Sequence, residues 1–332
     1  MAEDLLVVEN LRAGFHADSS DDAPTFLEVL DGVSFTVRAG ETLGLVGESG
    51  CGKSVSALSI MRLLPKPAGA IIGGSIRFEN QDLLSLPATA MANIRGRRIA
   101  MIFQEPMSAL NPVKRIGAQV EEMFARHMPD VGLRERRLRA LTMLQRVGIP
   151  APEQRLNEYP HQLSGGMRQR IMIAIALALE PALLLADEPT TALDVTIQAQ
   201  ILELIKELQQ STGMAVLFIT HDLGVVAELC DAVAVMYAGS IVETAPVNAL
   251  FAAPLHPYTR GLLASIPRLE GEPKQDLHVI PGMVPSLGAM PAGCRFAGRC
   301  SYAQAACATT PPLQPLQADH AVACVRAQEW LA

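Results

Sequence analysis

A glycine-rich segment early in the chain has the residue types that bind phosphate. Residues 47–54 read Gly-Glu-Ser-Gly-Cys-Gly-Lys-Ser and match the pattern G-x-x-x-x-G-K-[ST]. Glycines let backbone N–H groups turn toward a di- or triphosphate, and a following helix adds the positive end of its dipole. Lys53 can reach the β- and γ-phosphates, and the Ser54 hydroxyl can bind Mg²⁺. We therefore expect an ATP-binding loop formed by Gly47, Glu48, Ser49, Gly50, Cys51, Gly52, Lys53 and Ser54.

Two acids end an apolar run in the second half of the chain. Leu183 to Ala186 is followed by Asp187 and Glu188. At the end of a strand, Asp187 would hold Mg²⁺, and Glu188 could orient or deprotonate the water that attacks a phosphate. Apolar runs that end in acids are common in α/β proteins, so this pair gains weight from the phosphate loop that precedes it. The two motifs together predict hydrolysis of a bound nucleotide.

A second glycine-containing segment reads Leu-Ser-Gly-Gly-Met-Arg-Gln-Arg over residues 163–170. Its serine and glycines would open a helix and present further N–H donors to an anionic phosphate. The plain alternative is a helix N-cap followed by a glycine turn. One chain does not need two phosphate-binding helix ends for one nucleotide.

In this order, the three motifs resemble those of ABC ATPases, and the likeness covers roughly residues 5–244. The segment at 163–170 resembles the family signature, whose usual form begins L-S-G-G. In that family the signature contacts the ATP held by a partner chain. The resemblance therefore implies that the partner's ATP is contacted by Ser164, Gly165, Gly166 and Met167.

The resemblance also gives roles to four single positions. Gln104 resembles the glutamine that touches Mg²⁺ and water, and Asp194, in the segment Ala192 to Asp194, resembles the D-loop aspartate of the dimer interface. His221 resembles the histidine that contacts the γ-phosphate, and Phe15 the aromatic that stacks on adenine. A Phe beside a strand is often core, and a lone His is more often a loop residue than a catalytic one. The implied catalytic set is Glu188, His221, Lys53 and Gln104, with Mg²⁺ held by Ser54, Gln104 and Asp187.

Short apolar runs predict the strands that must position these motifs. They are Leu5 to Asn10, Val33 to Val37, Thr42 to Val46, Ile99 to Phe103, Leu183 to Ala186 and Ala215 to Ile219. Helical spacing runs from Val55 to Leu64 and over about 111–159. Strands, loops and helices in alternation indicate a parallel sheet. The expected fold class is α/β: an ABC-type P-loop ATPase with a RecA-like core, a helical subdomain and a C-terminal cysteine-containing extension.

The character of the chain changes after about Thr244, where proline becomes frequent and regular strands are not expected. This change predicts an ABC ATPase domain over residues 1–244, with its helical subdomain at about 106–180. Residues 245–332 form the predicted extension. No internal repeat is visible, and each nucleotide motif occurs once, which indicates a single ATPase unit.

Charge and apolar patterning argue against a nucleic-acid-binding protein and against a membrane-spanning one. The formal net charge is −7, and no basic stripe of the kind that binds nucleic acid is present, so no nucleic-acid partner is expected. The longest apolar run, Ile171 to Leu179, is far shorter than the ~20 residues of a membrane-spanning helix. The acidic N-terminus does not resemble a signal peptide. We expect a cytosolic protein.

Within the family, three segments resemble the ATPase subunits of dipeptide and oligopeptide importers: Phe103 to Pro112, Tyr159 to Arg170 and His256 to Thr259. The resemblance implies a peripheral subunit on the cytoplasmic face of the bacterial inner membrane that hydrolyses ATP to energise peptide import. Implied partners are two transmembrane permease subunits, a second and non-identical ABC ATPase subunit, and an extracytoplasmic solute-binding protein. The alternatives are import of nickel or glutathione, an exporter ATPase, and a soluble non-transport ABC ATPase.

Four of the six cysteines lie near the C-terminus, at Cys294, Cys300, Cys307 and Cys324. A disulfide is not expected in the cytosol. Thiolates bind zinc and iron–sulfur clusters, but zinc sites usually contain closely spaced cysteine pairs, which are missing here, although His320 could replace one cysteine. The importer resemblance points to a 4Fe-4S cluster. Zinc and four reduced thiols remain alternatives, and Cys51, inside the phosphate loop, is expected to be inert.

Overall fold

The computed structural model describes residues 3–17, 25–104, 109–190, 194–266 and 279–331. They form two compact units. The first unit contains residues 1–3, 38–40 and 85–218. The second contains residues 4–37, 41–84 and 219–332, so the N-terminal strands and the C-terminal part of the chain belong to the same unit. The predicted boundary near residue 245 does not coincide with this division, and the domain limits stay a prediction.

The second unit is built on a short, fully buried strand, β3 (Thr42–Val46). It pairs in parallel with β9 (Ala232–Tyr237), and β9 pairs antiparallel with β10 (Ser240–Pro246). Two short strands, β12 (His320–Val322) and β11 (Gln314–Gln317), continue the order β11-β12-β10-β9-β3. Continuous burial along β3 is what its uninterrupted apolar run predicts for a strand covered on both faces.

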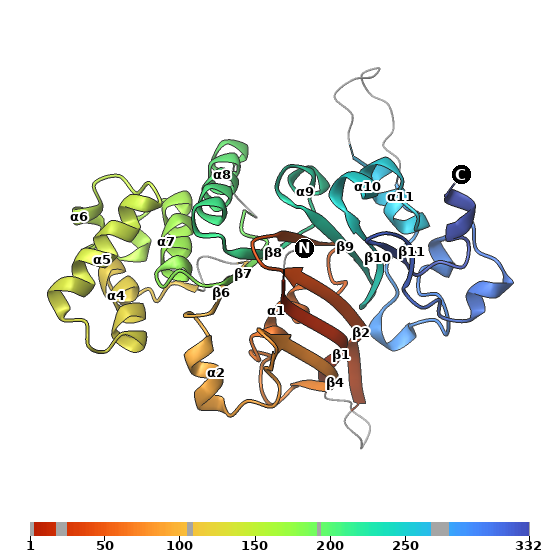
Figure 1. The fold of residues 1–332 in the computed structure, drawn as a ribbon, viewed down its shortest axis with the longest axis horizontal. Coiled ribbons are helices and arrows are strands. Elements are labelled where there is room, and N and C mark those ends of the chain that lie inside the picture. The colour runs from red at the N-terminus through yellow and green to blue at the C-terminus, as the bar shows by residue number, and fades with distance from the viewer. Residues whose placement is uncertain (1–2, 18–24, 105–108, 191–193, 267–278, 332) are drawn as a thin grey trace. The chain divides into compact units, whose positions relative to one another are not determined.

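A separate antiparallel sheet in the same unit has the order β2-β1-β4-β5 (Figure 1). Its strands are β1 (Asp4–Ala17), β2 (Thr25–Arg38), β4 (Gly69–Phe78) and β5 (Gln81–Asp82). The sequence analysis found only parts of β1 and β2 and missed β4. The segment of β4 contains three glycines and little periodicity, and its extended form depends on pairing with β1.

The described residues of this unit also form four α-helices. They are α1 (Lys53–Ile60), α9 (Leu223–Leu229), α10 (Val247–Ala252) and α11 (Pro257–Ala264). Helix α1 ends four residues before the predicted end at Leu64, and Arg62, just past its end, adopts a positive φ of 52°. That conformation does not continue a right-handed helix.

In the part of the first unit that the structure describes, three strands accompany a group of helices. Strands β6 (Ile99–Ile102) and β7 (Leu183–Asp187) pair in parallel, and β7 neighbours β8 (Ala215–Thr220), which belongs to this unit up to residue 218. The helices are α2 (Ala88–Ile94), α4 (Ile116–His127), α5 (Leu133–Arg146), α6 (Pro152–Arg155), α7 (Gly165–Leu177) and α8 (Val195–Thr212). Helices α4, α5 and α7 pack against one another through buried apolar side chains. The α/β class is therefore confirmed.

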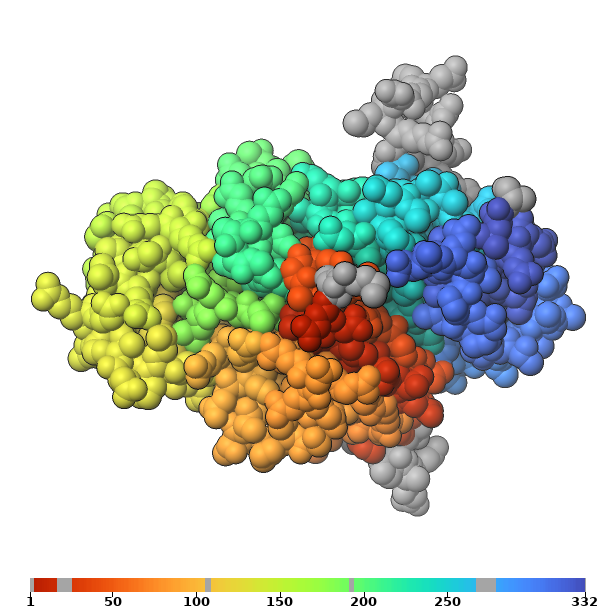
Figure 2. All heavy atoms as spheres, viewed as in Figure 1, coloured from red at the N-terminus to blue at the C-terminus, as the bar shows by residue number. Residues whose placement is uncertain are grey.

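The expectation that strands disappear after Thr244 is wrong. Strand β12 pairs with β10, with Val322 opposite Glu243 and Ala321 opposite Thr244. Strands of three and four residues have no readable periodicity and form here because the edge of β10 is available for pairing. Figure 2 shows the C-terminal residues, in blue, packed against the cyan segment that carries β10, α10 and α11. A small apolar core of Leu255, Val322 and Ala327 joins these elements.

Glu243 of β10 is a buried carboxylate that holds this region together. Its side chain is fully buried and accepts hydrogen bonds from the backbone N–H groups of Leu255 (2.7 Å) and His256 (2.9 Å). The Nε2 atom of His320 in β12 lies 2.8 Å from the same carboxylate. Burial lowers the pKa of His256 to about 4, so this imidazole is neutral and its Nδ1 accepts the Tyr258 N–H.

The described part of the chain contains no helix that is both long and apolar enough to span a membrane.

We expect the substitution Glu243→Gln to destabilise the chain. The amide has one acceptor oxygen where the carboxylate has two, so one buried N–H would face an NH₂ group and lose its hydrogen bond. This loss should lower the free energy of unfolding by about 2 kcal/mol. Urea unfolding monitored by circular dichroism measures this change. The control Glu228→Gln removes an exposed carboxylate of α9 and should change stability by less than about 0.5 kcal/mol. Equal midpoints for the two variants would contradict the assigned role of Glu243.

Candidate functional site

The glycine-rich segment lies between β3, which ends at Val46, and α1, which begins at Lys53. Two glycines make the turn possible. Gly47 has a φ of 157°, and a Cβ atom there would lie 2.1 Å from the carbonyl oxygen of Met236. Gly52 has a φ of 110°, and its Cβ would meet the Leu30 side chain at 2.7 Å. A side chain at either position would displace the loop.

Lys53 lies inside this loop. Its ammonium donates hydrogen bonds to the carbonyl oxygens of Gly47 (2.8 Å) and Glu48 (3.1 Å), and the residue is 4% exposed. Ser54 follows in the first turn of α1. Cys51 is buried, and burial raises the pKa of its thiol, so the thiol stays protonated at neutral pH. The loop thus places a cation beside its own carbonyl groups, at the start of a helix.

Glu48 makes two contacts that the sequence analysis did not foresee. Its backbone N–H donates to the Tyr258 hydroxyl at 2.8 Å, and its carboxylate forms a two-point ion pair with Arg299. Both partners come from the region after residue 245. The sequence drew attention to His256 to Thr259 only as a family segment, and nothing in the pattern singled out Arg299.

In the other compact unit, the structure brings together a glutamine and a glutamate that are 84 positions apart. Asp187 ends β7 and is 4% exposed, and Glu188 follows with a φ of 45°. Non-glycine residues rarely adopt this conformation, and it occurs preferentially at functional sites. The Gln104 side chain, just after β6, donates to the Glu188 carboxylate at 3.0 Å. An acid and an amide thus meet at the carboxyl ends of two paired strands.

The predicted helix after Ser164 is present as α7. The Ser164 hydroxyl accepts the Met167 N–H at 3.3 Å and caps the helix, and Gly165 and Gly166 form its first turn. Farther along, the buried side chain of Gln169 donates to the carbonyl oxygen of Pro189, next to Glu188. The sequence analysis missed Gln169, although a polar residue at an inward position of a helix was a possible signal.

The remaining predicted residues also have definite places. Asp194 caps α8, its carboxylate accepting the Ile197 N–H at 2.9 Å, whereas Ala192 and Leu193 lie outside the described residues. Glu105 to Ser108 of the predicted importer segment also lie outside them. His221 is exposed directly after β8, and Phe15 lies in β1, partly buried, with Gly69 of β4 opposite it.

All four C-terminal cysteines line one small cavity, together with residues that include His256 and Tyr302. Burial raises the pKa values of the Cys294, Cys300 and Cys324 thiols, and backbone N–H groups two residues ahead of each oppose this shift in part. Among the described residues, no group of three or more His, Cys, Asp or Glu side chains is arranged to hold a metal ion. His320 does not line this cavity and pairs with Glu243 instead.

The profiles of two protein families match parts of this chain. The profile of the ABC transporter family matches residues 30–191, a range that includes the phosphate loop, the segment at 163–170 and both acids. The profile described as the oligopeptide/dipeptide transporter C-terminal region matches residues 242–307. The second match covers three of the four C-terminal cysteines.

Individual proteins match over nearly the whole chain. A probable peptide ABC transporter ATP-binding protein, y4tR of Sinorhizobium fredii, is 53% identical over 99% of this chain and 96% of its own length. The oligopeptide transport ATP-binding protein AppD of Bacillus subtilis is 52% identical over 93% and 92%. The solved ATP-binding cassette MJ0796, bound to ADP and Pi, has a TM-score of 0.64 and 27% identity, covering 73% of this chain and 99% of that one. The predicted family is confirmed: the chain belongs to the ABC transporter ATP-binding proteins of the oligopeptide and dipeptide import family.

Proposed function

We propose that this chain hydrolyses ATP to energise the uptake of short peptides and acts at the cytoplasmic face of the bacterial inner membrane. One observation carries the proposal. The region that matches the oligopeptide/dipeptide transporters belongs to the same compact unit as the phosphate loop. The relatives that match over more than 90% of the chain are named as peptide and oligopeptide transport proteins. Import of nickel or glutathione by the same machinery is the second candidate.

The positions of these residues support distinct roles in hydrolysis. Gly47 to Gly52 would bind the phosphates through backbone N–H groups, with Lys53 on the β- and γ-phosphates and Phe15 beside the adenine. Glu188 would take the proton of the attacking water, and the hydrogen bond from Gln104 fixes the carboxylate that does so. His221 would contact the γ-phosphate.

Oxygen donors for a magnesium ion are present in the proposed set. The hydroxyl of Ser54, the amide of Gln104 and the buried carboxylate of Asp187 are of the type that Mg²⁺ prefers. When bound, the ion would neutralise charge on the β- and γ-phosphates. The dimeric cassette MJ0796 is described as holding ADP and Pi, which supports the same ligand class here.

The signature residues support a paired arrangement of ATPase subunits. Ser164 already caps α7, and the free N–H groups of a helix start suit an anionic phosphate. We therefore propose that Ser164, Gly165, Gly166 and Met167 contact the ATP of a second, non-identical ATPase subunit, with Asp194 at that interface. Two permease subunits and an extracytoplasmic solute-binding protein complete the proposed complex.

A metal site of four thiolates in the extension is a further part of the proposal. Four cysteines lining one cavity form a donor set that suits a 4Fe-4S cluster. Among the described residues, these side chains do not form a group arranged to hold a metal ion as they stand. Zinc is the alternative occupant.

Two substitutions separate binding from hydrolysis. Glu188→Gln should lower the ATPase rate of the assembled complex by about a hundredfold or more, since it removes the proton acceptor but no contact with the nucleotide. Lys53→Ala should instead weaken nucleotide affinity by at least about tenfold. Steady-state ATPase assays and titration with a fluorescent ATP analogue measure the two effects. Glu203→Gln, an exposed change on α8, is the control, and a normal rate for Glu188→Gln would reject the assignment.

The transported solute is tested in cells. A strain whose only copy carries Glu188→Gln should lose uptake of radiolabelled di- and tripeptides, because the proposed machinery cannot hydrolyse ATP. Uptake restored by the unchanged gene shows that the loss is specific. Normal peptide uptake with loss of nickel or glutathione uptake would replace the peptide proposal by its alternative.

Metal content tests the cysteine site. Protein purified without oxygen should be brown and contain about four iron and four sulfide per chain. Cys300→Ser should remove most of both, whereas Cys230→Ser, which changes a buried thiol outside the cavity, should leave them unchanged. Colourless protein with stoichiometric zinc, or with no metal, would contradict the cluster.

A further inference from the structure

The phosphate loop contains an acid whose charge opposes the ligand it is proposed to bind. Glu48 is the second residue of the loop, and its carboxylate side chain is 27% exposed. A carboxylate that shares a loop with the phosphate site repels a polyanion unless its charge is compensated. The loop residues themselves supply one cation, Lys53, whose ammonium donates hydrogen bonds to main-chain oxygens and to the Cys51 sulfur.

Arg299 of the C-terminal extension compensates this charge. Its two terminal nitrogens bind the two Glu48 carboxylate oxygens at 2.6 and 3.0 Å, and its side chain is 7% exposed. The guanidinium also donates to the carbonyl oxygens of Pro281 (2.9 Å) and Ile280 (3.4 Å), which fix its orientation. A partly buried, two-point pair of this kind is far less screened by solvent than a surface ion pair.

Tyr258 holds the backbone of the same residue. Its hydroxyl accepts the Glu48 N–H at 2.8 Å, and burial raises its pKa, so the hydroxyl remains neutral. The ring is fully buried and packs against Tyr237 and Phe296, with ring centroids 4.7 and 5.4 Å apart. Phe296 belongs to the extension, so the extension supports both contacts to Glu48.

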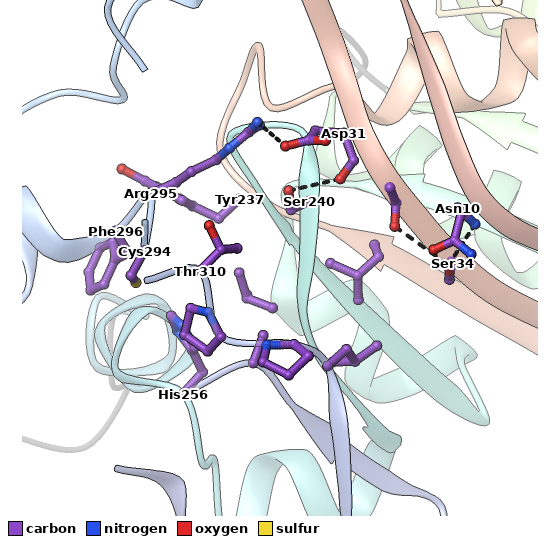
Figure 3. A pocket seen from close by; sticks show the side chains of 17 residues that line it. Asn10, Asp31, Ser34, Tyr237, Ser240, His256, Cys294, Arg295, Phe296 and Thr310 are labelled. Atoms are coloured by element: carbon purple, nitrogen blue, oxygen red, sulfur yellow. Dashed lines mark hydrogen bonds and ion pairs between the residues drawn. The ribbon is translucent and has the colours of Figure 1, made fainter. Parts of the chain in front are cut away.

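A second arginine of the extension anchors the same neighbourhood. Arg295 donates to the Asp31 carboxylate and to the carbonyl oxygen of Ala238, at the edge of a cavity of about 410 Å³ (Figure 3). The next residue, Gly239, donates its N–H to the Cys51 carbonyl at 2.8 Å. Arg299, next to Cys300, therefore contacts the phosphate loop itself, and Arg295, next to Cys294, contacts the turn that supports the loop.

We propose that Arg299 and Tyr258 are positioning residues for nucleotide binding and act through Glu48. Arg299 neutralises the carboxylate, and Tyr258 fixes the adjoining main chain. The C-terminal extension is thereby part of the ATP site. This inference rests on the proposed function only in that the loop binds ATP.

The test measures the affinity of the full-length chain for a fluorescent ATP analogue with Mg²⁺. Arg299→Ala should weaken binding by roughly tenfold, because Glu48 is left uncompensated beside the phosphates. Adding Glu48→Gln to that variant should restore affinity to within about threefold of the unchanged chain, since the repulsion disappears. Raising the salt concentration should also shrink the deficit of Arg299→Ala.

Controls separate this effect from general destabilisation. Arg77→Ala breaks the Arg77–Glu9 pair of the antiparallel sheet and should leave affinity unchanged. Arg299→Lys retains the charge without the two-point geometry and should lie between the unchanged chain and Arg299→Ala. If Arg299→Ala does not fold, Arg299→Lys and Tyr258→Phe provide the test. Both variants should show faster backbone hydrogen exchange over residues 47–53 than the unchanged chain.

The outcomes are distinguishable. If Lys53→Ala binds the analogue normally, the loop is not the nucleotide site and the proposed function fails. If Lys53→Ala loses binding but Arg299→Ala and Arg299→Lys do not, the proposed function stands and this inference is overturned. A deficit in Arg299→Ala that Glu48→Gln does not relieve would show a purely structural role and would also overturn it.

Discussion

The hydrogen bonds of Lys53 to the carbonyl oxygens of Gly47 and Glu48 are the interaction on which the rest of the site depends. They curl the loop around a cation, and the loop can follow only because Gly47 and Gly52 have no side chains to meet Met236 and Leu30. Those neighbours are held in turn by the buried strands β3 and β9 and by the antiparallel sheet. The loop that we propose binds phosphate is therefore shaped by these contacts, and a preformed loop lowers the entropic cost of binding.

The acids at the end of β7 are also held in place by neighbouring side chains. Glu188 occupies a conformation that is unfavourable for a non-glycine residue, by about 1–3 kcal/mol, so its surroundings must stabilise it. Gln104 holds the carboxylate, and Gln169 holds the carbonyl of Pro189 directly after it. The helix that carries the signature segment is thus hydrogen-bonded to the segment that carries the acids. Both contacts lie within one compact unit, so this arrangement does not depend on the other unit.

The C-terminal extension is best understood as a structural part of the ATPase. Glu243 links β10 to the start of α11 and to β12, while Arg295 and Arg299 extend from the cysteine-containing segment to Asp31 and Glu48. A proline-rich segment of this size buries little core of its own. Its ion pairs and its aromatic contacts through Phe296 with Tyr237 and Tyr258 compensate, and they bring its thiols and the phosphate loop into one unit.

The sequence by itself determined the local features: the phosphate loop, the helix start at Ser164, the acids at the end of an apolar strand, and the family. Each is a short contiguous pattern whose chemistry is readable without the fold. The tertiary structure alone decided the pairings over long sequence distances: Gln104 with Glu188, Glu48 with Arg299, and β12 with β10. It also showed the strands that the proline-rich composition concealed. Such contacts leave no periodic trace, because their geometry arises only when separate elements pack and exclude water from the groups between them.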